Sequence, residues 1–294
     1  MSRWWNTRRF DALELVFVTV LVAALVTVLV AAGVSSRERR QYAGIAYVAY
    51  SALQEATRLR DRYGPNQYSR NEEEWMIRDY FKDRHAGSFV DVGANHYKND
   101  SNTFYLETAL GWTGIAIDPQ AEFAADYRTH RPRTRFFSFF VSDTSDASVT
   151  FYQVEDNPLV SSADQRFAER AGTEARDPVH KTQAVSVPTI RLTDILDHAG
   201  VSRFDLLSVD VELAEPKVLA GFDINRFKPS LVCIEAHPQV RQQILDYFAG
   251  HGYVLLGRYL RADLQNLYFA PIGPADPSRP DVPARPQEGA PIKK

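Results

Sequence analysis

Residues 89–95 read FVDVGAN, and residues 113–119 read TGIAIDP. In each stretch a short apolar run ends near an acidic residue, first Asp91 and then Asp118. Runs of this length and composition are typical of strands that are buried in a parallel sheet. Gly93 follows the first run, and a glycine there lets the backbone turn sharply and come close to a ligand. Open parallel sheets bind their ligands at this carboxyl edge of the strands.

Further strands and helices alternate along the chain on the C-terminal side of these stretches. We predict helices near 102–110, 120–130, 215–220 and 239–249, and strands over 134–143, 204–211, 230–237, 252–257 and 264–271. Strands that alternate with helices favour a doubly wound parallel sheet. The last two strands have no helix between them, so we expect an antiparallel hairpin at one edge. The predicted fold is α/β, a Rossmann-like seven-stranded mixed sheet with helices on both faces and its last strand antiparallel.

The N-terminal part of the chain has the pattern of a membrane anchor. Leu15–Val34 contains no charged residue, and two serines extend the run to residue 36. A helix of about 20 residues spans the ~30 Å hydrocarbon core of a bilayer. We therefore predict one transmembrane helix over 15–36, after a short tail over 1–14. The alternative is a cleaved signal peptide, with Ala31–Gly33 as its cleavage site.

The orientation of this span is open on charge alone. Three arginines precede the apolar run and three follow it within a few residues. The positive-inside rule counts Lys and Arg near the ends of a span, and here the count is a tie.

A connector over 37–70 separates the span from the predicted domain, which we place over 71–270. From Arg39 to Tyr63, apolar residues recur every three or four positions, which predicts a helix with one apolar face. Gly64 and Pro65 then end it. This helix either packs on the domain or docks against other membrane subunits.

The C-terminal tail over 271–294 is rich in proline. Proline falls at every third residue from Pro271 to Pro286, which is the period of polyproline II. The segment is either a disordered tail or a strap that docks on a partner.

Composition excludes several kinds of function. The chain has 294 residues and a formal net charge of −3, and its arginines are scattered among acids, so nucleic acid is not an expected partner. The single cysteine, Cys233, excludes a disulfide within the chain and a cysteine cluster for a metal. We predict no metal site, and we expect Cys233 to be part of an inert core.

The loop after the first strand indicates the kind of cofactor. Asp118 ends the next strand, where an acid accepts hydrogen bonds from both hydroxyls of a ribose. Asn95 is followed by His96, Tyr97 and Lys98 with no later glycine, whereas a loop that binds a pyrophosphate needs further glycines. This disfavours NAD and FAD and fits a nucleoside cofactor without phosphate, S-adenosylmethionine.

At this level of detail the sequence resembles the FkbM family of S-adenosylmethionine-dependent methyltransferases. The matching segments run in the family's order from Phe89 to His237: FVDVGAN, SNTFYLETALGWTGIAIDP, FFVSD, VPTIRLTDIL, FDLLSVDVELAEPKVLAGF and LVCIEAH. The resemblance implies the class I methyltransferase fold and the methylation of a hydroxyl oxygen. It covers neither the first 70 residues nor the proline-rich tail.

The resemblance also implies roles for particular residues. The implied cofactor-binding residues are Asp91, Gly93, Asn95, Asp118, Ser142 and Asp143, and the implied catalytic residues are Asp210 and Glu212. The first three would border the methionine end of the cofactor, Asp118 would hold the ribose, and the Ser-Asp pair would lie by the adenine. The two catalytic carboxylates would face the methyl group and the acceptor, whose proton one of them takes. The alternative for Asp91 and Asp118 is helix capping, and for His96 and His237 a structural hydrogen bond.

Two departures from the family pattern leave two functions open. Tyr97 and Leu213 stand where the family has glycine, and each adds a side chain near the cofactor pocket. One function is a membrane-anchored O-methyltransferase that acts on a membrane-associated or small-molecule acceptor. Its domain would then be cytoplasmic, because S-adenosylmethionine is a cytoplasmic metabolite. The alternative is a non-catalytic subunit that keeps the fold and scaffolds a membrane protein complex through its anchor, connector helix and tail.

Overall fold

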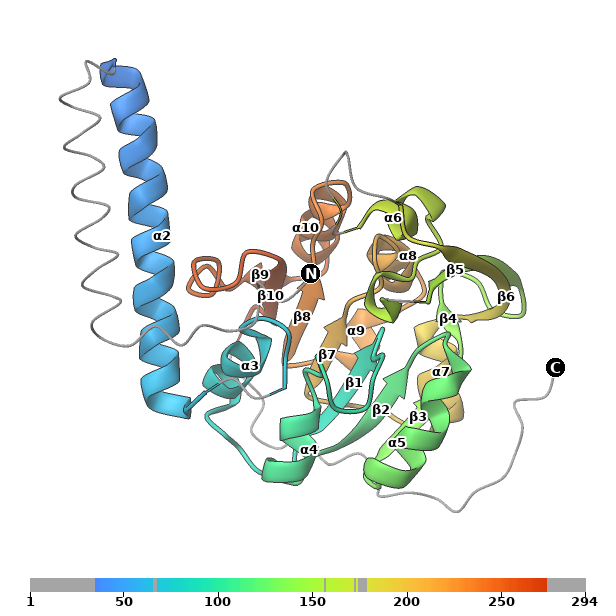
Figure 1. The fold of residues 1–294 in the computed structure, drawn as a ribbon. Helices are drawn as coiled ribbons and strands as arrows, with labels where there is room; N and C mark the ends of the chain where they lie inside the picture. The colour runs from blue at the N-terminus through green and yellow to red at the C-terminus, as the bar shows by residue number, and fades with distance from the viewer. Residues whose placement is uncertain (1–34, 66–67, 156, 172, 174–178, 274–294) are drawn as a thin grey trace. The chain divides into compact units, whose positions relative to one another are not determined.

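A computed structural model describes residues 35–65, 68–155, 157–171, 173 and 179–273 of the chain (Figure 1). The chain forms two compact units, with the boundary between Gly64 and Pro65. The predicted tail over 1–14 and all but the last two residues of the predicted span over 15–36 lie outside the described residues. Within the described ranges, no helix has both the length and the apolar character that a membrane span requires.

The described part of the first unit is a single long helix, α2 (Ser36–Tyr63). It begins three residues before the predicted Arg39 and ends where predicted, since Gly64 takes a φ of 76° and donates its N–H to Arg60 at 2.8 Å. A glycine in this left-handed conformation is a common end of a helix. Contacts within the helix include the Arg58–Glu55 ion pair one turn apart.

The second unit is built on a seven-stranded sheet with the order β3-β2-β1-β7-β8-β10-β9 (Figure 1). Its strands are β1 (Ser88–Val92), β2 (Thr113–Ile117), β3 (Thr134–Phe137), β7 (Leu206–Val209), β8 (Leu231–Glu235), β9 (Tyr253–Leu255) and β10 (Asn266–Pro271). Neighbouring strands among β3, β2, β1, β7 and β8 are parallel, and β10 pairs antiparallel with both β8 and β9. The predicted mixed sheet and its antiparallel final strand are confirmed.

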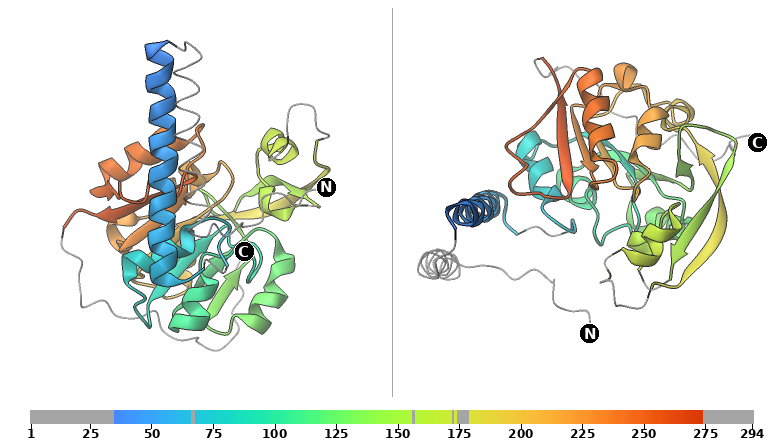
Figure 2. Two further views of the ribbon diagram at one scale, coloured as in Figure 1. Left: turned by 60° about the vertical axis from the view of Figure 1, so that its left-hand side comes forward. Right: turned by 90° about the horizontal axis from the view of Figure 1, so that it is seen from above.

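Helices cover both faces of this sheet, as predicted. They are α3 (Glu73–Phe81), α4 (Phe104–Leu110), α5 (Ala124–His130), α7 (Leu192–His198), α8 (Glu215–Ala220), α9 (Ile224–Phe227) and α10 (Arg241–Gly250), with the short 3-10 turn η1 (Ala121–Phe123) before α5. Seen from above, α3 and α10 lie on opposite sides of the sheet (Figure 2).

Alternation along the strands divides the core between the two faces. Ile115 and Ile117 of β2 belong to a large cluster with apolar residues of α7, α8, α9 and α10. Ala116, which points the other way, packs with Tyr127 of α5. A strand that is buried on both faces reads as a continuous apolar run, which is why β1 and β2 could be recognised in the sequence.

The middle of the chain differs from the prediction. The strand expected over 134–143 is two strands, β3 and β4 (Phe140–Val141), and the second leaves the main sheet. It joins β5 (Ser148–Val154) and β6 (Thr182–Ile190) in a three-stranded sheet, in which β5 and β6 form a long antiparallel pair. Between these two strands lie η2 (Pro158–Val160) and α6 (Gln165–Arg170).

The C-terminal end of the domain lies slightly beyond the predicted boundary. Pro271 is the last residue of β10 and pairs with Tyr253 of β9, so it belongs to the sheet and not to the tail. β10 lies between β8 and β9, but its pairing with β8 ends at Phe269, so Pro271 extends beyond β8 and pairs with β9 alone. A proline is accepted where one side of its backbone makes no ladder hydrogen bonds. The rest of the predicted tail, from residue 274 onward, is outside the described residues.

Candidate active site

A cavity of about 240 Å³ lies at the carboxyl ends of the parallel strands. Residues at or just after the ends of β1, β2, β7 and β8 line one side of it, and they include Gly93, Asn95, Asp118, Asp210, Glu212, Glu235 and His237. Residues of η2 and α6 form its roof. The chain leaves β1 towards β2 on one side and later returns to β7 on the other, so the cavity sits where the strand order reverses.

Gly93 is required by the backbone of the neighbouring strand. It has a φ of 81°, and a Cβ at this position would lie 1.6 Å from the carbonyl oxygen of Asp210. The two strand ends are also joined by the hydrogen bond from Asp210 N to Val92 O, at 2.9 Å. The close approach holds Asp210 against the first loop of the site.

Asp118 joins the loops that follow β1 and β2. Its Oδ2 accepts a hydrogen bond from the backbone N–H of Asn95 at 3.0 Å, and its Oδ1 accepts one from that of Gln120 at 2.9 Å. Asp118 is 4% exposed, and burial raises the pKa of its carboxyl group to about 6 although these hydrogen bonds act in the opposite direction. Asp118 therefore both orders the two loops and presents a carboxylate to the cavity.

Three of the predicted cofactor-binding residues do not line the cavity. Asp91 is buried and accepts a hydrogen bond from Thr103 Oγ1 at 2.8 Å, in a polar network that continues to Arg131. Ser142 Oγ donates to Asp143 Oδ1 at 3.0 Å, and neither residue borders the cavity, although their neighbour Val141 does. The structure thus brings Gly93, Asn95 and Asp118 together with the predicted catalytic pair, and leaves these three outside.

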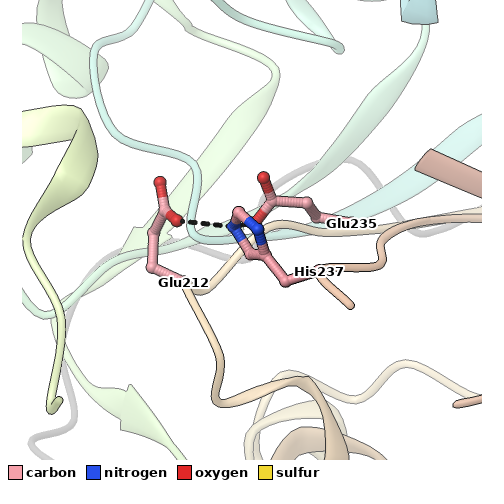
Figure 3. A group of neighbouring side chains, drawn as sticks. All are labelled: Glu212, Glu235 and His237. Carbon is pink, nitrogen blue, oxygen red and sulfur yellow. Dashed lines mark hydrogen bonds and ion pairs between the residues drawn. The ribbon is translucent and has the colours of Figure 1, made fainter. Parts of the chain in front are cut away.

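The predicted catalytic residues lie with two further side chains on the other side of the cavity. Figure 3 shows His237 between the carboxylates of Glu212 and Glu235, and its Nε2 is 3.2 Å from Glu212 Oε2 and 3.1 Å from Glu235 Oε2. Asp210 is next to this group, and its side chain is exposed to the cavity. Four ionisable side chains from the ends of β7 and β8 thus share one wall.

This crowding changes the proton affinities of the group. Surrounding protein atoms and the charges of Glu235 and Glu212 raise the pKa of Asp210 well above its ordinary value. Burial raises the pKa of Glu212 to about 7, and the two carboxylates beside His237 raise the pKa of that imidazole to about 10. Strongly shifted groups that meet in one cavity are a mark of a functional site.

The two residues that depart from the family pattern do not border the cavity. The Tyr97 ring stacks on His130 of α5, with ring centres 4.6 Å apart, and packs against the Ala94–Ala116–Tyr127 cluster. Leu213 has a φ of 78° and packs against the main core. Neither side chain is among those that border the cavity, so the expected narrowing is not found.

Glu235 is the residue of this wall that the sequence prediction missed, and for His237 a structural role was favoured over a catalytic one. The signal was present in LVCIEAH, where an acid ends a buried strand just as Asp118 ends β2. By contrast, the inert role predicted for Cys233 is consistent with its burial, which raises the pKa of its thiol well above the ordinary value. His96 has a structural role, because its Nδ1 accepts from the backbone N–H groups of Lys98 and Asn99.

A comparison with protein-family models identifies the family of this domain. A family model described as the methyltransferase FkbM domain matches residues 91–255. Among solved structures, a TehB-like SAM-dependent methyltransferase from Corynebacterium glutamicum aligns with 13% identity over 75% of this chain and 97% of its own, at a TM-score of 0.39. No curated protein matches the chain significantly.

Proposed function

Since the chain belongs to the FkbM methyltransferase family, we propose that it transfers the methyl group of S-adenosylmethionine to a hydroxyl oxygen of its acceptor. The observation that carries this proposal is the cavity itself. One open space at the reversal of the strand order presents Asp118 on the β2 side and the Asp210–Glu212 pair on the β7 side. A ribose-binding carboxylate and a proton acceptor are thereby held on either side of one binding site.

The residues of the cavity fit this cofactor. The described residues that line it include six carboxyl side chains and two basic ones, the guanidinium of Arg70 and the imidazole of His237, whose pKa is raised to about 10. Such an excess of negative charge favours a positively charged sulfonium over a phosphate-bearing cofactor. Beside Asp118, the apolar side chains of Ile117, Phe139 and Val141 offer a wall on which an adenine ring can pack.

The proposed reaction is a direct displacement. S-adenosylmethionine, when bound, supplies an electrophilic methyl group: the acceptor oxygen forms the new C–O bond, and the C–S bond breaks with its electron pair left on sulfur. The acceptor's proton passes to a carboxylate of the Asp210–Glu212 pair, which must lie within about 3 Å of the hydroxyl to take it. The rigid strand ends align the reactants, and alignment supplies much of the lowering of the barrier.

The proposal includes a membrane location. Its support is the uncharged sequence of Leu15–Val34, which would tether the domain near membrane-associated acceptors. The cytoplasmic side is proposed because the cofactor is made there. Carbonate washing of membranes tests the anchor, which should require detergent for release. Protease protection tests the side, and an external domain would overturn this part of the proposal.

Cofactor binding is the direct test of the function. In calorimetric titration of the full-length protein we expect S-adenosylmethionine to bind with a dissociation constant in the micromolar range or lower, about −8 kcal/mol. Asp118→Ala should weaken binding, since each hydrogen bond to a charged group contributes about 1.5–3 kcal/mol. Asp126→Ala, which removes an exposed carboxylate on α5, is the matched control and should bind as the wild type does. A folded protein that binds no S-adenosylmethionine at millimolar concentration would contradict the methyltransferase function and favour the non-catalytic scaffold.

A further inference from the structure

We propose that Glu212, Glu235 and His237 bind a divalent transition-metal ion, for which Mn²⁺ is the appropriate probe. One carboxylate oxygen from each glutamate and a ring nitrogen of His237 lie within 4.8 Å of one another (Figure 3). The role of the ion in the reaction rests on the proposed function, but its binding does not.

The first argument is an unsatisfied group. His237 Nε2 carries at most one proton, yet two carboxylate oxygens approach it, at 3.2 Å from Glu212 and 3.1 Å from Glu235. The hydrogen bond goes to Glu212. Oε2 of Glu235 has no hydrogen-bond partner within the described part of the chain, although Glu235 is only 8% exposed. Only the ion pair with His237 offsets the burial of this oxygen among the described contacts, and a bound cation would offset it directly.

The second argument is distance. Metal–nitrogen and metal–oxygen bonds to such ligands are about 2.0–2.2 Å long, so two ligand atoms at a right angle around one ion lie about 3 Å apart. The two distances from Nε2, 3.1 and 3.2 Å, have this size. The three ligand atoms lie within 4.8 Å of one another, so the two carboxylates need to move closer together to share one ion.

The third argument is that the fold holds the ligands in place. Glu235 is the last residue of β8, and His237 follows two residues later. Glu212 follows β7 in a left-handed conformation, with a φ of 53°, and its carbonyl oxygen accepts a hydrogen bond from Ser162 Oγ at 2.7 Å. The ring of Phe167 packs edge-on against His237, with centres 5.1 Å apart. Ligands that stand on rigid strand ends and are supported by neighbours bind an ion with little loss of entropy.

The donor atoms indicate the kind of ion. Two carboxylate oxygens and one imidazole nitrogen suit Mn²⁺, Fe²⁺ or Zn²⁺ better than Ca²⁺ or Mg²⁺, which prefer oxygen alone. The three side chains line the cavity, so positions on the ion remain open towards an acceptor. An ion held there would lower the pKa of a bound hydroxyl, and the neighbouring Asp210 would accept its proton. In this arrangement Glu212 holds the ion and Asp210 is the base.

The test is metal binding by the full-length protein in detergent, stripped with EDTA and then titrated with Mn²⁺ without cofactor. We expect one ion per chain, detected by calorimetry and by the loss of the free Mn²⁺ electron paramagnetic resonance signal. Glu235→Gln and His237→Ala should each weaken binding by about tenfold or more. Asp246→Asn, which changes an exposed carboxylate on α10, is the control and should bind like the wild type. Circular dichroism verifies that each variant is folded.

Two outcomes would overturn the proposal. One is a folded wild-type protein that binds neither Mn²⁺ nor Zn²⁺, and the other is binding that both cavity variants leave unchanged. Failure of the metal site and failure of the proposed function are distinguishable. Methyl transfer that continues undiminished in EDTA would show that the reaction does not need the ion, while the proposed methyltransferase function would stand. Metal binding by a protein that binds no S-adenosylmethionine would support the metal site and contradict the proposed methyltransferase function.

Discussion

Gly93 and Asp118 show how closely structural and chemical demands overlap in this cavity. No side chain fits at Gly93, because the carbonyl oxygen of Asp210 occupies the position of a Cβ. Asp118 holds the backbone of Asn95 and Gln120 before any ligand arrives. An acid at this strand end was predicted from the sequence. Its double role was not, because neither hydrogen-bond partner is recognisable before the two loops are brought together.

At this scale, cofactor affinity should depend on pH through Asp118. Burial raises its pKa to about 6, so at lower pH the carboxyl is protonated and loses its capacity to accept from the ribose. We expect the affinity for S-adenosylmethionine to fall by up to about tenfold per pH unit below pH 6 and to be constant above about pH 7. Asp118→Asn should bind more weakly and lose this dependence. Calorimetry from pH 5 to 8 measures both, and an equal slope in wild type and variant would contradict the assignment.

Among the elements, those of the main sheet were predicted best, because their physical signal is local. The apolar runs of β1, β2, β7 and β8 follow from burial on both faces, and the helices between them follow from chain order. The small sheet was missed for the opposite reason. Its strand β6 is exposed along much of one side and pairs with β5 across a long connection, so neither a continuous apolar run nor a tight turn marks it. The split between β3 and β4 was missed because β3 pairs with β2 and β4 with β6, strands that are distant in the sequence.

The contact between α4 and the end of α5 should be among the most sensitive in the domain. Arg131 is fully buried, and its Nε donates to Glu107 Oε2 at 2.5 Å, while Nη2 donates to Thr103 Oγ1. Arg131→Met leaves Glu107 as a buried charge without its cation and should lower the free energy of unfolding by about 3–5 kcal/mol. Arg133→Met removes an exposed guanidinium and should cost less than about 1 kcal/mol. Urea denaturation compares them, and equal losses would show that the buried pair has no special weight.

Seen as a whole, the domain accumulates negative charge at one place. Carboxyl groups from segments far apart in the sequence meet at the cavity, although the net charge of the chain is only −3. The composition therefore did not predict this concentration of carboxyl groups, because only the folded sheet brings the strand ends together. The same folding that gathers carboxyl groups at the cavity also leaves buried acids with raised pKa values, among them Glu73 and Glu215.

The stability of the domain should consequently decrease as the pH rises. Burial raises the pKa of Glu215 to about 7, so the folded protein holds this proton more tightly than the unfolded chain does. The free energy of unfolding then falls between about pH 4.5 and pH 7 and stays low above that. At pH 8, Glu215→Gln should raise the free energy of unfolding by up to about 3 kcal/mol and raise the melting temperature accordingly. At pH 5 it should leave both nearly unchanged. Thermal unfolding in EDTA measures this, and an equal gain at both pH values would exclude ionisation as the cause.

The left-handed backbone conformation at Leu213 limits which residues can replace this leucine. A leucine with a φ of 78° has a conformational cost of roughly 1 kcal/mol that glycine would not have, and its packing against the main core offsets that cost. A single substitution can relieve the backbone or keep the packing, but not both. A library of all replacements at this position should therefore contain two separate groups of tolerated residues. One group is glycine and asparagine, and the other is the long unbranched apolar residues. Valine and isoleucine satisfy neither demand and should be depleted.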